Sequence, residues 1–148
     1  MKAKYYFQDF FSLIWPRICL SCGNSLFKYE NEICTQCWLL LPRTNFHLRA
    51  DNPVSRLFWG RANIETAASF FYFSKGSKVQ HLMHCLKYKG NKEIGIVLGK
   101  AYGYELLKSP YFNTVNRIIP VPLHPKRLRY RGYNQSECFA KGLAETMN

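Results

Sequence analysis

Residues 118–144 read IIPVPLHPKRLRYRGYNQSECFAKGLA, and this stretch says most about the fold. The β-branched run at residues 116–121 predicts a short strand. A basic loop follows as far as Tyr133, and a helix is expected from Asn134, a good N-cap with Glu137 in the capping-box position. A strand, a loop and a helix in this order are typical of an open α/β sheet, in which ligands bind beyond the carboxyl ends of the strands.

The loop between this strand and helix is strongly cationic. No acidic residue occurs between Leu106 and Ser136, and the same window contains Lys108, Arg117, Lys126, Arg127, Arg129 and Arg131. A helix N-terminus offers free N–H groups and a positive dipole to an anion. The spacing therefore fits a phosphate or pyrophosphate site, and it fits a solvated basic loop equally well.

The pattern upstream predicts one more strand and two helices. Residues 64–73, IETAASFFYF, are expected to form a buried strand. An apolar stripe over residues 79–86 predicts a helix that ends at Gly90, and a second helix is expected over residues 92–107.

Three glycines recur at every fourth position in the second of these helices: Gly95, Gly99 and Gly103. Each glycine in a helix interior costs about 1 kcal/mol relative to alanine. Three on one face therefore predict that another backbone packs closely against this helix.

Four of the six cysteines form two Cys-x-x-Cys pairs, Cys19 with Cys22 and Cys34 with Cys37. Zinc prefers four tetrahedral ligands, and a two-residue gap lets one tight turn present two thiolates to the same ion. Gly23 follows the first pair and can adopt the positive φ that such a turn often needs. The spacing predicts a closed structural zinc site, in preference to a redox dithiol, which needs only one such pair.

Composition and charge limit the broad class. The chain has 148 residues, of which 47% are hydrophobic, and a formal net charge of +12, so it is a globular protein drawn to phosphates, nucleic acid or an anionic membrane surface. Apolar positions over residues 7–14 predict a short amphipathic helix that Pro16 stops. The apolar run at residues 10–15 is too short to span a bilayer, and no signal cleavage site follows, so we expect a cytoplasmic protein.

The quoted stretch closely resembles the signature of the ComF family, a Pro-Val-Pro-Leu turn, then Lys-Arg, then Arg-Gly-aromatic-Asn-Gln at the start of a helix. LKYKG at residues 86–90 is similar to an upstream element of that family, which also has a four-cysteine zinc module ahead of it. The resemblance covers nearly all of the chain. It implies a role in natural competence and DNA uptake.

This resemblance implies a type I phosphoribosyltransferase fold, which binds phosphoribosyl pyrophosphate together with magnesium. The segment from Pro120 would then lie on the pyrophosphate side. By the same matching, the residues that hold or shape the phosphate site are Lys126, Arg127, Arg131, Gly132, Asn134 and Gln135.

A second element of the phosphoribosyltransferase pattern is missing. It consists of two adjacent acids that hold the ribose hydroxyls, followed by a Gly- and Thr-rich loop for the 5-phosphate. The only aspartates here are Asp9 and Asp51, and no two acidic residues are adjacent. We therefore expect a truncated or split protein, leave catalysis open, and expect magnesium and phosphoribosyl pyrophosphate to bind only a full-length relative.

The expected organisation is an N-terminal helix and zinc module over residues 1–48, followed by the first part of a phosphoribosyltransferase-like α/β domain over residues 49–148. One alternative is a zinc- and basic-patch-dependent module that binds single-stranded nucleic acid without catalysis, because Tyr130 and Tyr133 lie among the arginines. Another is a zinc module that binds a protein of the DNA-uptake machinery.

Overall fold

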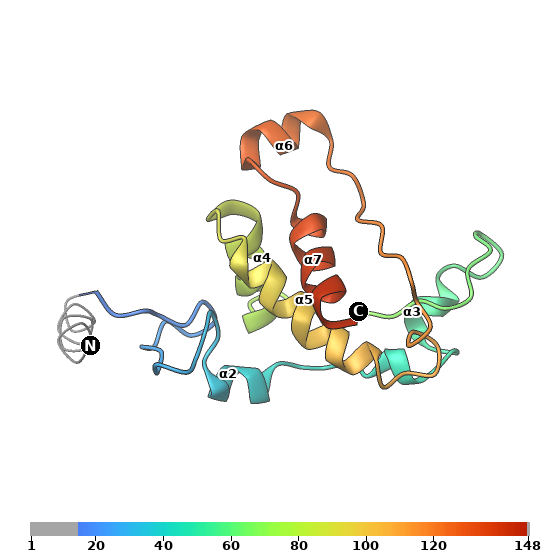
Figure 1. The fold of residues 1–148 in the computed structure, drawn as a ribbon, viewed down its shortest axis with the longest axis horizontal. Helices are drawn as coiled ribbons and strands as arrows, with labels where there is room; N and C mark the ends of the chain where they lie inside the picture. Colours follow the sequence, from blue (N-terminus) through green and yellow to red (C-terminus); the bar gives the residue numbers. More distant parts are fainter. Residues whose placement is uncertain (1–14, 148) are drawn as a thin grey trace. The chain divides into compact units, whose positions relative to one another are not determined.

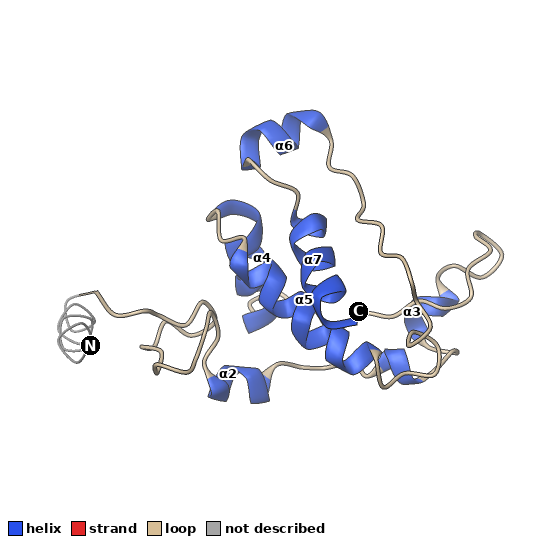
Figure 2. Ribbon diagram, viewed as in Figure 1, coloured by secondary structure: helices blue, strands red, loops and turns tan. Residues whose placement is uncertain are grey.

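A computed structural model describes residues 15–147, and the helix expected over residues 7–14 lies outside them. The elements are α2 (Thr35–Leu40), the 3-10 helix η1 (Phe46–Leu48), α3 (Pro53–Arg56), α4 (Lys78–Tyr88), α5 (Glu93–Leu106), α6 (Pro125–Arg131) and α7 (Gln135–Met147) (Figure 1). Residues 15–147 contain no strand, only two isolated antiparallel bridges, Ile18 with Ser25 and Arg43 with Phe71 (Figure 2).

Both predicted strands are wrong at the level of secondary structure, so an α/β fold is not confirmed. Residues 64–73 make a single bridge, and residues 116–121 form no element. A β-branched run fixes the preference for an extended backbone, but a strand also needs a neighbouring backbone to complete its hydrogen bonds. The described part of the chain supplies that neighbour for only a few residues of the first segment.

The predicted helices α4, α5 and α7 are confirmed. The Ser77 hydroxyl caps α4 by accepting from the Gln80 N–H at 3.2 Å, and the chain leaves this helix just before Gly90, whose φ is +70°. At the start of α7 the Asn134 side chain accepts from the Ser136 N–H at 3.0 Å. The sequence signals that start and stop helices therefore act here as expected.

Close packing of α5 against α7 confirms the interpretation of the glycine stripe. A Cβ on Gly99 would lie 2.2 Å from the Phe139 carbonyl oxygen, and a Cβ on Gly142 would lie 2.2 Å from the Ile96 carbonyl oxygen. Real Cβ atoms do not approach an oxygen this closely. Glycine at both positions is therefore what lets the two backbones touch.

Backbone contacts divide the chain into a first compact unit that ends at Leu41 and a second that begins at Pro42. The second unit has an apolar core whose most buried side chains include Leu82, Cys85, Ile94 and Leu98. Among the residues of the first unit that the structure describes, the fully buried side chains are Cys19, Ile33 and Cys37. None of the helices described over residues 15–147 is long and apolar enough to cross a membrane.

Candidate metal centre and basic helix

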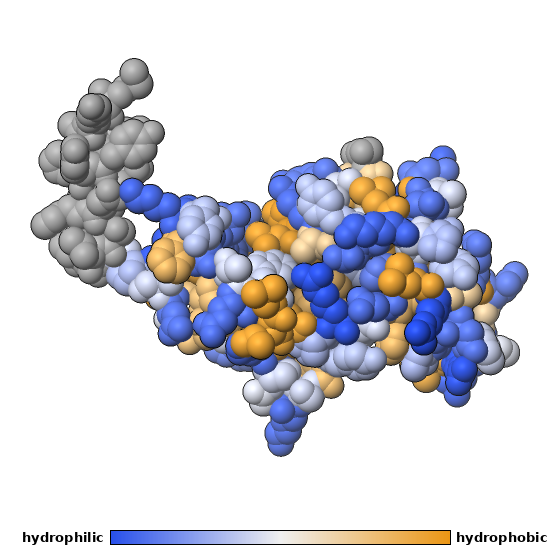
Figure 3. All heavy atoms as spheres, turned by 90° about the horizontal axis from the view of Figure 1, so that it is seen from below, coloured by the Kyte–Doolittle hydropathy of each residue, from blue (hydrophilic) through white to orange (hydrophobic). Residues whose placement is uncertain are grey.

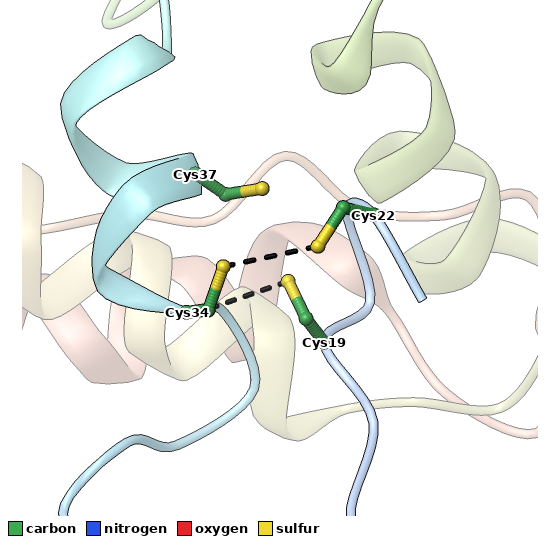
Figure 4. A group of neighbouring side chains, drawn as sticks. All are labelled: Cys19, Cys22, Cys34 and Cys37. Atoms are coloured by element: carbon green, nitrogen blue, oxygen red, sulfur yellow. Dashed lines mark hydrogen bonds between the residues drawn. The ribbon is translucent and has the colours of Figure 1, made fainter. Parts of the chain in front are cut away.

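The sulfur atoms of Cys19, Cys22, Cys34 and Cys37 converge in the first unit (Figure 4). All four lie within 4.8 Å of one another, and the Sγ atoms of Cys22 and Cys34 are 3.8 Å apart. Four thiolates at tetrahedral corners about 2.3 Å from one ion lie about 3.8 Å from each other. The thiols are free, not paired in disulfides. Their arrangement fits a closed metal site, and a tetrahedral set of four sulfurs suits zinc.

A tight turn presents the first two thiols. The Gly23 N–H donates to the Cys19 carbonyl at 2.8 Å, and the Cys19 N–H donates to the Asn24 carbonyl at 2.8 Å. Gly23 has a φ of +79°, the left-handed conformation that only glycine adopts without strain. The turn therefore depends on glycine directly after Cys22, as its sequence position indicated.

The start of α2 presents the other two thiols. Cys34 is the N-cap of this helix and Cys37 lies in its first turn, so the two sulfurs lie on one face. The Trp38 N–H donates to the Cys34 carbonyl at 3.0 Å. Because the helix fixes the second pair and a hairpin-like turn fixes the first, the site is formed by two short segments that are distant in sequence.

Glu30 connects the segments around the cysteine cluster, and sequence reasoning missed it. It is 7% exposed, and its carboxylate accepts from the Thr35 N–H at 2.7 Å and from the Phe27 N–H at 2.9 Å. These two bonds, with that from Thr35 the larger cause, hold its pKa below the ordinary range. A carboxylate at the first N–H groups of α2 also suits the helix dipole. No pattern of spacing marks this residue in the sequence.

The pKa values of two thiols in the cluster are shifted in opposite directions. Burial disfavours the Cys19 thiolate, but the Cys34, Cys22 and Ser21 N–H groups stabilise it and lower its pKa to about 7. Burial raises the pKa of Cys34 to about 12. The surroundings of Cys19 thus favour its thiolate and burial disfavours that of Cys34, whereas a bound dication supplies the charge that ionises a coordinating thiol.

His47, which follows the second cysteine pair by ten residues in the sequence, is not part of the cluster. It belongs to η1 in the second unit, is 3% exposed, and meets the Tyr102 ring edge-on at a centroid distance of 5.8 Å. Burial lowers its pKa, so it is a neutral core histidine.

The predicted basic loop is instead mostly helical, which corrects the sequence interpretation. At the start of α6 the His124 side chain accepts from the Lys126 N–H at 3.3 Å, and Pro125 occupies the first helical position. At its end Gly132 has a φ of +75°, and its N–H donates to the Leu128 carbonyl at 2.8 Å. Proline at the start and glycine just past the end are signals that were present in the sequence. The high density of positive charge favoured the interpretation as a loop.

Among residues 15–147, the cations of α6 have no carboxylate partner. Lys126, Arg127 and Arg129 are exposed and Arg131 is half-buried. Throughout the described part of the chain, no carboxylate lies within ion-pair distance of any of the four. Their charge is therefore available to an anion from outside the protein.

The turn after α6 packs against the end of α4. The Arg131 guanidinium lies 5.4 Å from the centre of the Tyr88 ring, and the Lys92 ammonium lies 5.2 Å from the centre of the Tyr133 ring. The Tyr133 hydroxyl donates to the Leu86 carbonyl. Two motifs that are far apart in the sequence, LKYKG at 86–90 and RGYNQ at 131–135, are thereby brought into contact.

Asn134 and Gln135 shape this junction. Asn134 is 4% exposed, and its amide donates to the Val121 carbonyl at 3.0 Å, which ties the preceding segment to α7. The Gln135 carbonyl oxygen accepts from Arg131 at 2.9 Å, while its Nε2 is buried without a hydrogen-bond partner. Of the six residues predicted for a phosphate site, three lie on α6 and three lie after it. Lys126, Arg127 and Arg131 belong to the helix, whereas Gly132 ends it, Asn134 precedes α7 and Gln135 begins α7.

Comparison with known proteins gives a limited result. No protein-family model matches the chain, and no solved structure matches it. Proteins that do match are the DNA utilization protein YhgH of Shigella flexneri and that of Escherichia coli O6:H1, each 28% identical over 139 residues, which is 88% of this chain and 55% of the relative. The chain spans about half the length of the curated relatives that it matches.

Proposed function

We propose that this chain is a zinc-containing, ComF-like protein of DNA uptake that works in the cytoplasm and contacts phosphate groups through α6. The observation that carries the proposal is the contact between the LKYKG and RGYNQ motifs through Tyr133, Arg131 and Tyr88. Two sequence elements of one family that meet in space are expected to form one site. The similarity to proteins named for DNA utilization, over 88% of the chain, supports the same process.

The chemistry of the proposed site is anion binding. The four cations of α6, which no carboxylate of the described residues pairs with, are well suited to phosphate oxygens, with which arginine can form paired hydrogen bonds. Gln135 and the Tyr88 ring hold the Arg131 guanidinium in place. In the proposed phosphoribosyltransferase-like arrangement this side of the site meets pyrophosphate.

The adjacent acids and the 5-phosphate loop are missing from the sequence, so this chain alone is expected to bind the complete ligand poorly. Isothermal titration with phosphoribosyl pyrophosphate and magnesium tests this directly. We expect no binding tighter than about millimolar, which corresponds to about 4 kcal/mol. Micromolar binding would show that the site is complete without those groups.

A second candidate function is binding of single-stranded DNA by the same helix. Tyr130 is 82% exposed between two arginines of α6, as in a site where bases stack on an aromatic ring and cations hold the backbone. Filter binding of an oligonucleotide at two salt concentrations tests this candidate. Each phosphate contact on a single strand contributes a slope of about −0.7 to the logarithmic salt dependence of binding.

Single-residue variants test whether single-stranded DNA binds through α6. We expect Arg127→Ala and Arg129→Ala each to weaken binding and to make the salt dependence shallower by about one contact. Arg61→Ala removes the same charge from an exposed position elsewhere in the second unit and serves as the matched control. Equal losses in all three variants would mean that net charge, not this helix, attracts the DNA.

A further inference from the structure

A loop of the second unit carries large apolar side chains into solvent. It follows α3, and Figure 1 shows it extending away from α7. Leu57 is 65% exposed, Phe58 39%, Trp59 61% and Ile64 42%. Figure 3 shows one face of the molecule, on which hydrophobic side chains reach the surface among hydrophilic ones. Single exposed apolar residues are common, but three large ones in succession mark a contact surface. We call residues 57–64 the apolar tip.

Hydrogen bonds close the neck of this loop. The Ser55 hydroxyl donates to the Ala67 carbonyl at 3.0 Å and accepts from the Ala67 N–H at 3.0 Å. The Asn52 amide donates to the same carbonyl at 2.8 Å and to the Arg49 carbonyl at 2.9 Å. Asn52 and Ser55 are both buried. Buried polar side chains thus hold the two ends of the loop together, as in other compact surface loops whose ends are close.

The backbone of the apolar tip is also held by hydrogen bonds. The Phe58 carbonyl accepts from the Arg61 N–H at 3.0 Å and from the Ala62 N–H at 3.1 Å. Between these residues Gly60 has a φ of +70°, a conformation that glycine adopts without strain. An ordered backbone therefore presents the apolar side chains, so their exposure is part of the fold, and a partner that binds them does not have to order this backbone.

The loop itself is close to neutral, whereas the chain as a whole is strongly cationic. Asp51 pairs with Arg56 at 2.6 Å, and the Arg56 guanidinium also lies 5.8 Å from the centre of the Trp59 ring. Arg61 is the only charged residue of the apolar tip, and the acidic Glu65 directly follows the tip. The formal net charge of the chain is +12. The tip can therefore enter an apolar layer at little cost in buried charge, while the rest of the protein is attracted to an anionic surface.

A lipid bilayer fits this combination better than a nucleic acid does. Leu57 and Ile64 are aliphatic and offer no ring on which a base can stack, and the cations suited to a phosphate backbone are concentrated on α6 instead. At a membrane surface, tryptophan lies at the level of the headgroups, while leucine and phenylalanine reach the start of the acyl chains. Anionic lipids in addition attract a cationic protein to that surface.

We propose that the apolar tip is a membrane-docking loop, which inserts Leu57, Phe58 and Trp59 into the interface of a bilayer that contains anionic lipid. The closed neck holds the tip in place, and the net positive charge of the chain keeps the protein against the headgroups. This inference goes beyond the proposed function and does not depend on zinc, on phosphate binding by α6 or on DNA.

Flotation of the full chain with lipid vesicles measures docking. We expect binding to vesicles of equal parts phosphatidylcholine and phosphatidylglycerol, and binding at least about tenfold weaker to phosphatidylcholine alone. Leu57→Ser should weaken binding to the mixed vesicles by about tenfold, because it removes an apolar side chain that the bilayer buries. Leu128→Ser is the matched control, since it removes the same side chain from α6, where Leu128 is 43% exposed. It should leave binding within about twofold.

The fluorescence of Trp59 distinguishes insertion from purely electrostatic adhesion. A variant with Trp15→Phe and Trp38→Phe keeps Trp59 as its only tryptophan. Its emission should be that of a water-exposed indole in the free protein and should shift to shorter wavelength when the mixed vesicles are added. Lipids brominated on their acyl chains should quench it. This measurement tests the inference even if Leu57→Ser fails to fold, which circular dichroism shows.

Several outcomes would overturn the inference. They are absence of binding to the mixed vesicles, equal losses from Leu57→Ser and Leu128→Ser, and binding without a shift in the emission of Trp59. Emission at short wavelength before lipid is added would show that another part of the protein covers the tip. Self-association that Leu57→Ser abolishes would assign the tip to a second copy, and loss of oligonucleotide binding without loss of vesicle binding would assign it to nucleic acid.

Discussion

Among single residues, Glu30 has a structural role beside the cysteine cluster that the spacing of the cysteines does not predict. Its two oxygens accept from the N–H groups of Phe27, inside the stretch between the cysteine pairs, and of Thr35, directly after Cys34. A free carboxylate in this place accepts both bonds, whereas the neutral amide of glutamine offers only one accepting oxygen. Glu30 therefore helps to hold the two segments in the arrangement that the metal needs.

We expect Glu30→Gln to make the metal easier to remove, measured as the chelator concentration that strips half of the zinc. The effect should depend on pH. The pKa of Glu30 is lowered in the folded protein, so its contribution is complete above the ordinary glutamate pKa and disappears as the pH falls through the folded value. The difference between the variant and the original protein should shrink over that range. Glu65→Gln, at an exposed position, should show no difference at any pH.

The cysteines themselves lead to a simple stoichiometric prediction. Elemental analysis should find one zinc ion per chain, and Cys19→Ser should abolish binding, because serine is not ionised at neutral pH. Cys138→Ser provides the comparison, since Cys138 lies on α7 outside the cluster and should leave the zinc content unchanged. Zinc at less than half an equivalent in a folded sample would contradict the site.

The contact of α5 with α7 is the main packing event between elements, and it depends on backbone proximity. At Gly99 a new methyl group would meet backbone atoms, the Phe139 carbonyl at 2.2 Å and the Gly142 Cα at 3.0 Å. At Gly103 it would meet a side chain, the Thr146 Cβ at 2.9 Å. The Thr146 Cβ also moves only with its helix, but the overlap at Gly103 is smaller, because the nearest carbonyl oxygen there, that of Leu143, is 3.4 Å away.

This contrast predicts different costs for the same substitution. Gly99→Ala should destabilise the second unit by about 2 kcal/mol or more, even though alanine is the better helix former by about 1 kcal/mol. Gly103→Ala should cost distinctly less. Denaturant unfolding of both variants measures the two costs on one scale. Equal costs would mean that the helices are not in close contact at Gly99.

At the scale of the whole molecule, the two compact units have different sources of stability. The described residues of the first unit bury only three of the four cysteines, Glu30, Ile33 and Leu41, and small units of this kind depend on a metal for their folding. The second unit contains α4, α5 and α7 around its own apolar core. Loss of metal should therefore affect the units unequally.

Removal of zinc by a chelator should unfold the first unit and leave most of the helical signal of the second. Nuclear magnetic resonance of the metal-free protein should show collapsed shifts for residues 17–41 and dispersed shifts for the core of the second unit, such as Leu82 and Leu98. Re-addition of zinc should restore the original spectrum. Cooperative loss of all structure in one step would show that the second unit cannot stand without the metal.

The sequence alone determined the parts of this protein that depend on local chemistry. Paired cysteines at short spacing predicted the metal cluster, Asn134 predicted the start of α7, and the stripe through Gly99 predicted a close helix contact. Each of these follows from a few neighbouring residues, because caps, tight turns and helix faces are set by local backbone geometry.

Tertiary structure decided the features that need a contact with a distant segment of the chain. Residues 64–73 and 116–121 have strand-forming sequences, but a strand exists only where another backbone completes its hydrogen bonds. The role of Glu30, the contact of Tyr133 with Leu86 and the hydrogen bonds between Ser55 and Ala67 likewise arise between segments that are distant in sequence. Local conformational preference does not predict such contacts, because they depend on how the whole chain folds.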